Sequence, residues 1–179
     1  MTEREQRVRL FCALRLPHDW LDGLVAWQQQ LDVRGARRVA RENLHVTLAF
    51  LGHRPRSDVD GAVEALREAA AEAAPPVLRV ARYRETRSVG MLVCDDEERR
   101  AAALADDLHG RLERLGVYER EARRWLPHVT VLRFRERPRL DPPLPDLGPV
   151  SPSDAAVYLS TLRPGGAQYA VLEAVGLGG

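Results

Sequence analysis

Two residue types are missing from the 179-residue chain, which contains neither lysine nor isoleucine. All 27 basic residues are therefore arginine, an abundance that we attribute to codon usage and not to selection for guanidinium chemistry. Cysteine is scarce, and Cys12 and Cys94 both lie in apolar, strand-like segments where a thiol packs as a small hydrophobic side chain. Two cysteines exclude a disulfide framework and are too few to form a metal site.

A membrane-spanning segment is also missing, because no run approaches the roughly 18 apolar residues that a transmembrane helix needs. Residues 1–7 are charged where a secretory signal peptide would be apolar. We therefore expect a cytoplasmic protein without membrane partners. With 45% hydrophobic residues, a chain of this length can bury about two-thirds of its unfolded surface, so we expect residues 1–179 to form one domain with two lobes.

The net charge of +1 conceals an uneven distribution of arginine. Residues 34–56 contain six arginines and one acidic residue, and residues 120–139 contain seven arginines and two acidic residues, so each window carries a net charge of +5. Such windows are either solvated faces or surfaces that contact phosphate groups. The composition does not decide between these interpretations.

The hydrophobic pattern alternates between strand and helix signals. Residues 8–16 are apolar at every second position, the period of a strand, and Trp20, Leu24, Trp27 and Leu31 recur at helical spacing. By these criteria we predict strands at 8–16, 44–51, 77–83, 88–94, 128–134, 155–162 and 168–175, and helices at 20–31, 57–74 and 101–115. A proline-rich loop is expected at 138–153.

One short pattern occurs twice. The segment Leu-His-Val-Thr-Leu at 44–48 is matched by Pro-His-Val-Thr-Val at 127–131, and a Pro-Arg pair follows each histidine after ten residues. The chain has five histidines and five threonines, so two chance His-x-Thr matches have a probability of only about 0.8%. We therefore interpret the two motifs as functional counterparts.

Strand geometry places each histidine beside its threonine, because side chains two residues apart point to the same face. Behind them we expect a buried face formed by Val46, Leu48 and Phe50 in the first motif and by Val129 and Val131 in the second. Two imidazoles can supply the base and the acid that cleavage of a phosphodiester requires near neutral pH. The threonine hydroxyls can hold phosphate oxygens as these gain charge.

These motifs resemble those of the bacterial RNA 2',3'-cyclic phosphodiesterases, also called 2'-5' RNA ligase-like proteins, of the 2H phosphoesterase superfamily. The Glu-Asn-Leu before the first motif, the Phe-Leu-Gly at 50–52 and Pro127 extend the resemblance. It implies an α+β, bilobal fold with pseudo-twofold symmetry, in which two antiparallel sheets face a central cleft, helices lie outside and each lobe carries one motif. It also implies that no metal or other cofactor is needed.

The chemistry implied by the resemblance is opening of a terminal 2',3'-cyclic phosphate to a 2'-phosphate, with the 3'-oxygen leaving. Some members also join tRNA half-molecules through a 2',5' bond, so tRNA fragments are candidate partners, and a monomer is expected. Position by position, the resemblance makes His45 and His128 catalytic. The phosphate contacts are then assigned to Thr47, Thr130 and Arg133.

The pattern leaves the cleft positions of two residues open. Arg133 follows His128 by five residues, an odd offset that faces it away from the cleft unless a bulge or the strand end redirects it. Phe11 lies on the opposite face of its strand from the apolar side chains, where it either stacks on an RNA base or packs under a helix. His18, His53 and His109 have no surrounding motif, and we expect them at the surface.

The order of the acid and the base depends on the surroundings. If Arg133 reaches the phosphate, its charge disfavours a protonated imidazole nearby, which suggests His128 as the base and His45 as the acid.

Other functional classes differ in what they require of the sequence. The sequence lacks the ligand motif that a metal hydrolase would need, and a non-catalytic RNA-binding function would leave the two matched histidines unexplained. A 2',5'-oligonucleotide phosphodiesterase or a small cyclic-nucleotide phosphodiesterase would use the same four motif side chains.

Overall fold

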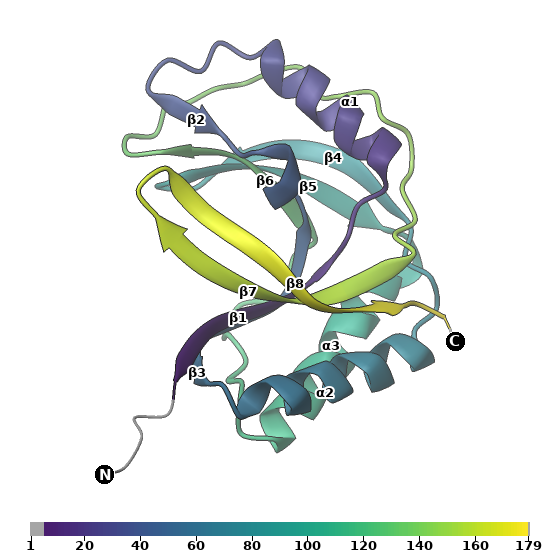
Figure 1. Ribbon diagram of the computed structural model, residues 1–179. Coiled ribbons are helices and arrows are strands. Elements are labelled where there is room, and N and C mark those ends of the chain that lie inside the picture. The colour runs from purple at the N-terminus through teal and green to yellow at the C-terminus, as the bar shows by residue number, and fades with distance from the viewer. Residues whose placement is uncertain (1–5, 179) are drawn as a thin grey trace.

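The computed structural model describes residues 6–178, which form two four-stranded antiparallel sheets (Figure 1). The first sheet has the order β3-β1-β7-β8 and the second has the order β2-β6-β5-β4. The strands of the first sheet are β1 (Arg7–Leu14), β3 (Val46–Pro55), β7 (Asp154–Arg163) and β8 (Gly166–Gly176). Those of the second sheet are β2 (Ala36–Arg38), β4 (Leu78–Glu85), β5 (Val89–Asp96) and β6 (His128–Phe134). Each sheet therefore contains one motif strand.

Three α-helices of the described residues cover the outer faces of the sheets. Helix α1 (His18–Gln29) lies over the second sheet, and α2 (Asp58–Glu72) and α3 (Arg100–Arg114) lie against the first (Figure 1). The buried amide of Gln28 fixes α1 by donating to the carbonyls of Val39 and Val131, at 3.1 and 2.8 Å. No helix within residues 6–178 is long and apolar enough to cross a membrane.

The arrangement confirms the α+β class with two antiparallel sheets and outer helices. The predicted strands and helices are all present, with ends shifted by a few residues, and Gly116 ends α3 with a φ of 71°. Strand β2 and the 3₁₀ turns η1 (Arg41–Asn43) and η2 (Glu97–Arg99) were not predicted. They are three residues long, too short to show a hydrophobic period.

The expected surface position of His109 is wrong, although His18 and His53 are exposed. His109 is only 5% exposed because it lies on the inner face of α3, three residues before Leu112 and four after Ala105. Its Nε2 lies 2.7 Å from the carbonyl oxygen of Leu48, and its ring packs against Tyr118. This histidine therefore ties α3 to the strand of the first motif.

Candidate active site

The two motifs occupy equivalent places on their strands. His45 immediately precedes β3 and His128 begins β6, and Thr47 and Thr130 follow on the same faces. All four side chains are partly exposed. The charge of His128 acts on His45, and so does the charge of Arg133. The structure thus brings both histidines and the predicted arginine to one site between the sheets.

Both imidazoles are oriented by the backbone. The Nδ1 atoms of His45 and His128 each lie 2.8 Å from the carbonyl oxygen two residues earlier, in Asn43 and Leu126 respectively. A carbonyl can only accept, so each Nδ1 carries a hydrogen and donates it. Each neutral ring therefore carries its lone pair on Nε2, the atom at which it can take up a proton. In the first motif, Nε2 lies 2.9 Å from the hydroxyl of Thr47, which donates to it.

The ring of His45 is set in an aromatic cluster. The centroids of Phe11 and Tyr169 lie 4.9 and 5.6 Å from it, and Phe11 stacks on Tyr158 at 4.8 Å. Burial lowers the pKa of His45 to about 4, although the hydrogen bond to Asn43 acts in the opposite direction. The charges of His128 and Arg133 lower the pKa further. His45 is therefore a neutral imidazole at physiological pH.

Phe11 is 3% exposed, so its side chain belongs to this cluster and its outer surface is not open. The face of β1 on which it lies was predicted correctly, because Phe11 and Ala13 form a small buried cluster with Ala156 and Tyr158, separate from the main core. Phe11 therefore neither offers an open face to an RNA base nor packs under a helix, because it packs against the ring of His45 within this cluster. Tyr169, which is partly exposed, was not predicted as a site residue.

A bulge at the same position in each motif reverses the strand parity. In β3, Thr47 pairs with Ala13 and Ala49 with Cys12, so Leu48 is the extra residue. In β6, Thr130 pairs with Met91 and Leu132 with Gly90, which makes Val131 the extra residue. Both bulges fall three residues after the histidine, and they move the residue at offset five to the face of the motif.

The bulges determine which face of the strand carries the residue five positions after each histidine. Arg133 is exposed on the motif face and lines the cleft, so the condition for its predicted position is met. Phe50 was expected to be buried with Val46 and Leu48, and this is wrong: it is 46% exposed. The guanidinium of Arg9 lies over its ring at 4.7 Å. Strand parity read without the bulge gave the wrong side for this residue.

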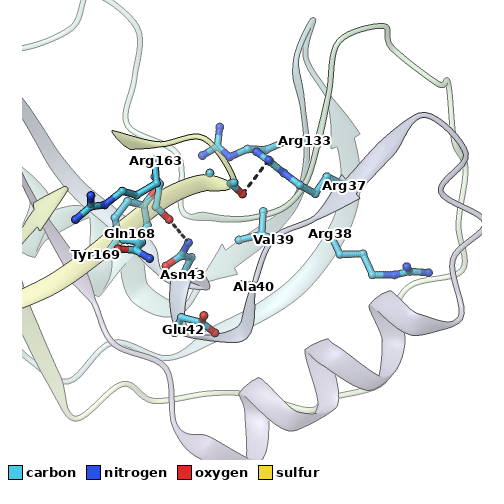
Figure 2. A pocket seen from close by; sticks show the side chains of 13 residues that line it. Arg37, Arg38, Val39, Ala40, Glu42, Asn43, Arg133, Arg163, Gln168 and Tyr169 are labelled. Carbon is cyan, nitrogen blue, oxygen red and sulfur yellow. Dashed lines mark hydrogen bonds between the residues drawn. The ribbon is translucent and has the colours of Figure 1, made fainter. Parts of the chain in front are cut away.

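Beside the histidines, a cavity of about 570 Å³ opens between the β2–η1 segment and the β7–β8 hairpin (Figure 2). Arginines from three segments line it, namely Arg37 and Arg38, Arg133, and Arg163. The remaining side chains that matter below are those of Glu42, Asn43, Gln168 and Tyr169. The hairpin residues were missed because they lie far from both motifs in sequence, and only the antiparallel fold brings them to the site.

Six of the thirteen arginines in the two basic windows form ion pairs. In the first window Arg34, Arg41 and Arg54 form ion pairs with aspartates. In the second window Arg120, Arg123 and Arg137 pair with acidic side chains. The solvated-face interpretation therefore holds for these six, whereas Arg37 and Arg133 line the cavity. Within residues 6–178, no three His, Cys, Asp or Glu side chains form a group that could hold a metal ion.

The family model described as LigT like phosphoesterase matches residues 14–88 of this chain. The RNA 2',3'-cyclic phosphodiesterase of Methanocaldococcus jannaschii is 23% identical over 180 residues, which cover 93% of this chain and 99% of that relative. Its likeness to this chain extends through the second motif.

Two solved structures share the fold over nearly the whole chain. The protein TT0787 of Thermus thermophilus superposes with a TM-score of 0.83 at 28% identity, covering 96% of this chain and 98% of that one. LigT of Escherichia coli in complex with 3'-AMP superposes with a TM-score of 0.81 at 24% identity, covering 97% and 100% of the two chains.

Proposed function

We propose that this chain, which resembles the LigT-like phosphoesterases, hydrolyses the 2',3'-cyclic phosphate at the 3' end of an RNA to a 2'-phosphate, without a metal ion or other cofactor. The observation that carries the proposal is the matched orientation of His45 and His128, with each Nδ1 bound to a carbonyl at 2.8 Å. This arrangement leaves two Nε2 atoms, one from each sheet, for proton transfer. The M. jannaschii relative named as an RNA 2',3'-cyclic phosphodiesterase supports the substrate.

In the proposed reaction, water attacks phosphorus and the bond from phosphorus to the 3'-oxygen breaks. One imidazole accepts a proton from the water, and the other donates a proton to the 3'-oxygen, which leaves as a hydroxyl group. Because the two histidines come from facing sheets, they can flank the phosphate on opposite sides, as displacement in line requires. The hydroxyls of Thr47 and Thr130, with Arg133, stabilise the charge on the non-bridging oxygens.

For the order of the two roles, we keep His128 as the base and His45 as the acid. Arg133 was expected to act on His128, but its charge lowers the pKa of His45. A neutral His45 can act as the acid only if it takes up a proton when the anionic phosphate enters the site, since an adjacent negative charge favours the imidazolium. Binding of the substrate should therefore be coupled to proton uptake.

A 2',5'-oligonucleotide phosphodiesterase or a small cyclic-nucleotide phosphodiesterase would use the same four motif side chains. Joining RNA ends through a 2',5' bond would run in the same direction, with an RNA 5'-hydroxyl attacking phosphorus in the place of water and the 3'-oxygen leaving. The products separate these reactions, because only opening of a terminal 2',3'-cyclic phosphate with loss of the 3'-oxygen yields a 2'-phosphate end.

The test uses an oligonucleotide that ends in a 2',3'-cyclic phosphate, incubated with the protein and excess EDTA. We expect complete conversion to the 2'-phosphate isomer at the rate seen without EDTA. A rate lost on chelation and restored by zinc or manganese would contradict the metal-independent mechanism. A 3'-phosphate product would contradict the assignment of the leaving group.

A further inference from the structure

Two arginines face each other across neighbouring strands beside the motif histidines. Arg37 of β2 and Arg133 of β6 are direct partners in the antiparallel pairing, and both line the cavity. Like charges placed directly opposite in a sheet destabilise it. An anion between them would remove this repulsion, so the pair is more consistent with a ligand site than with a purely structural role.

Three of the four arginines that line this cavity, Arg37, Arg133 and Arg163, are available to bind such an anion, whereas Arg38 donates to the carbonyls of Gln28 and Leu31. The ion pairs among residues 6–178 include none made by Arg37, Arg133 or Arg163. Arg37 donates through Nη1 to the carbonyl of Gly165 at 3.1 Å, which fixes its direction and leaves most of its N–H donors open. Glu42, the acidic side chain of the lining, lies away from Arg37 and Arg133 (Figure 2).

The cavity adjoins the proposed catalytic centre. Arg133 lines the cavity and lies on the same face of β6 as His128 and Thr130, so it adjoins both places. Tyr169 connects them in the same way, because it lines the cavity and its ring contacts that of His45 edge to face, at 5.6 Å. A ligand that fills both places must carry one negative group at the histidines and another at the arginines.

We propose that Arg37 and Arg163, with Arg133 between the two places, bind the phosphate on the 5' side of the terminal nucleotide, and that Tyr169 and Gln168 contact the nucleoside. The inference rests on the proposed function and makes its substrate class narrower. A nucleoside 2',3'-cyclic phosphate has no 5'-phosphate to offer the arginines, whereas an RNA end fills both places. The protein therefore prefers RNA ends to cyclic mononucleotides.

The experiment compares adenosine 2',3'-cyclic phosphate with the same compound carrying a 5'-phosphate. We expect the 5'-phosphate to raise kcat/KM of the unaltered protein roughly tenfold or more, the value of one charge-assisted hydrogen bond. Arg163→Ala and Arg37→Gln should each reduce this preference severalfold, with a smaller effect on the unphosphorylated compound. The matched control is Arg56→Ala, an exposed arginine of the first basic window that does not line the cavity.

The dependence of affinity on salt concentration tests the same contacts in a second way. Counterion release lowers the apparent affinity for a single strand with a slope of roughly 0.7 per phosphate contact, so the dinucleotide ApA with a terminal cyclic phosphate should depend on salt more steeply than the cyclic mononucleotide. Each arginine variant should reduce this difference, and Arg56→Ala should retain it.

The outcomes separate the two proposals. If neither the cyclic mononucleotide nor the dinucleotide is hydrolysed, the proposed function is wrong. If both are hydrolysed but the 5'-phosphate has no effect, or if both arginine variants keep the full preference, the phosphate site is wrong and the proposed function stands. Hydrolysis of the unphosphorylated compound by each variant also shows that the variant is folded.

Discussion

The two motifs share their backbone geometry and differ in what surrounds them. Each histidine binds the carbonyl two residues earlier, and each strand has a bulge after three residues. Around His45 the chain places Phe11, Tyr169 and, at offset five, Phe50, whereas offset five from His128 is Arg133. The backbone thus makes the two sites alike, and the neighbouring side chains make them unlike.

In the mechanism that we propose, this difference would let one structural pattern supply two chemical roles. Burial of His45 among aromatic side chains favours its neutral ring, so in the absence of substrate its pKa is lowered to about 4. A site of this kind gains its proton together with an anionic ligand. The asymmetry of the roles therefore has to be measured with substrates and variants, because the motifs alone are nearly identical.

Removal of either imidazole should have the largest effect. We expect His45→Ala and His128→Ala to lower kcat/KM on a cyclic-phosphate RNA end by about 10² to 10⁴ each, with the double variant barely slower because the pair acts as a unit. His53→Ala, which alters an exposed histidine at the end of β3, is the matched control and should keep full activity. Additive losses in the double variant would show that the two rings act independently.

The comparison is sharpened by a leaving group that needs no acid. On a nitrophenyl phosphodiester, the loss caused by His45→Ala should be much smaller than on RNA, whereas the loss caused by His128→Ala should persist, because only the acid becomes dispensable. The measurement is the ratio of rates on the two substrates for each variant. Equal losses on the nitrophenyl substrate would overturn the assignment of His45 as the acid.

The threonines should show a smaller difference between the motifs. Thr130→Val should lower kcat roughly 10- to 100-fold by removing one donor to the phosphate oxygens. Thr47→Val should cost less, because the Thr47 hydroxyl also occupies Nε2 of His45 and its removal frees that atom. Serine at either position should restore most of the rate. A larger loss at Thr47 than at Thr130 would contradict this interpretation of the hydrogen bond.

The smallest expected effect concerns stability. The pKa of His45 is lowered from 6.5 to about 4, so between these values the unfolded chain binds more protons than the folded protein. Stability contributed in this way is present above pH 6.5 and is lost as the pH falls toward 4. The melting temperature of the unaltered protein relative to His45→Gln should therefore decline over this range. A difference that stays constant from pH 7 to pH 4 would refute the lowered pKa.

Proton uptake by His45 can be followed directly. Calorimetric titration with 3'-AMP at pH 6.5 in buffers of different ionisation enthalpy measures the protons taken up on binding. We expect net uptake in the unaltered protein and a clear reduction in His45→Gln. Equal uptake by the two proteins would place the proton elsewhere and remove the condition under which His45 acts as the acid.

The hydrophobic period predicted the sheets and helices because the buried faces of long elements repeat regularly, as in α3 with Leu104, Leu108 and Leu112. The duplicated motif likewise indicated both histidines from the sequence alone. The errors of the sequence-based prediction were confined to single strand positions. A bulge adds one residue without changing the composition, so Phe50 was placed on the wrong face and the position of Arg133 remained conditional.

The hydrophobic pattern could not predict contacts between distant segments, for a different reason. Arg163, Gln168 and Tyr169 reach the cavity only because β7 and β8 pair and turn back toward β2. Nothing in the local sequence encodes that proximity. In the same way, His109 has no motif, and its burial follows from the packing of α3 against β3.

The side-chain bonds that cross between the sheets limit how the molecule can move. Trp125, in the segment before β6, donates through Nε1 to the carbonyl of Thr47 at 3.1 Å, and Arg37 reaches Gly165 of the β7–β8 turn. Asn43, just before the first motif, donates to Ala167 of β8 at 2.8 Å. A hinge motion that separates the sheets would break the first two of these bonds together. We therefore expect the width of the cleft to change little when a ligand binds.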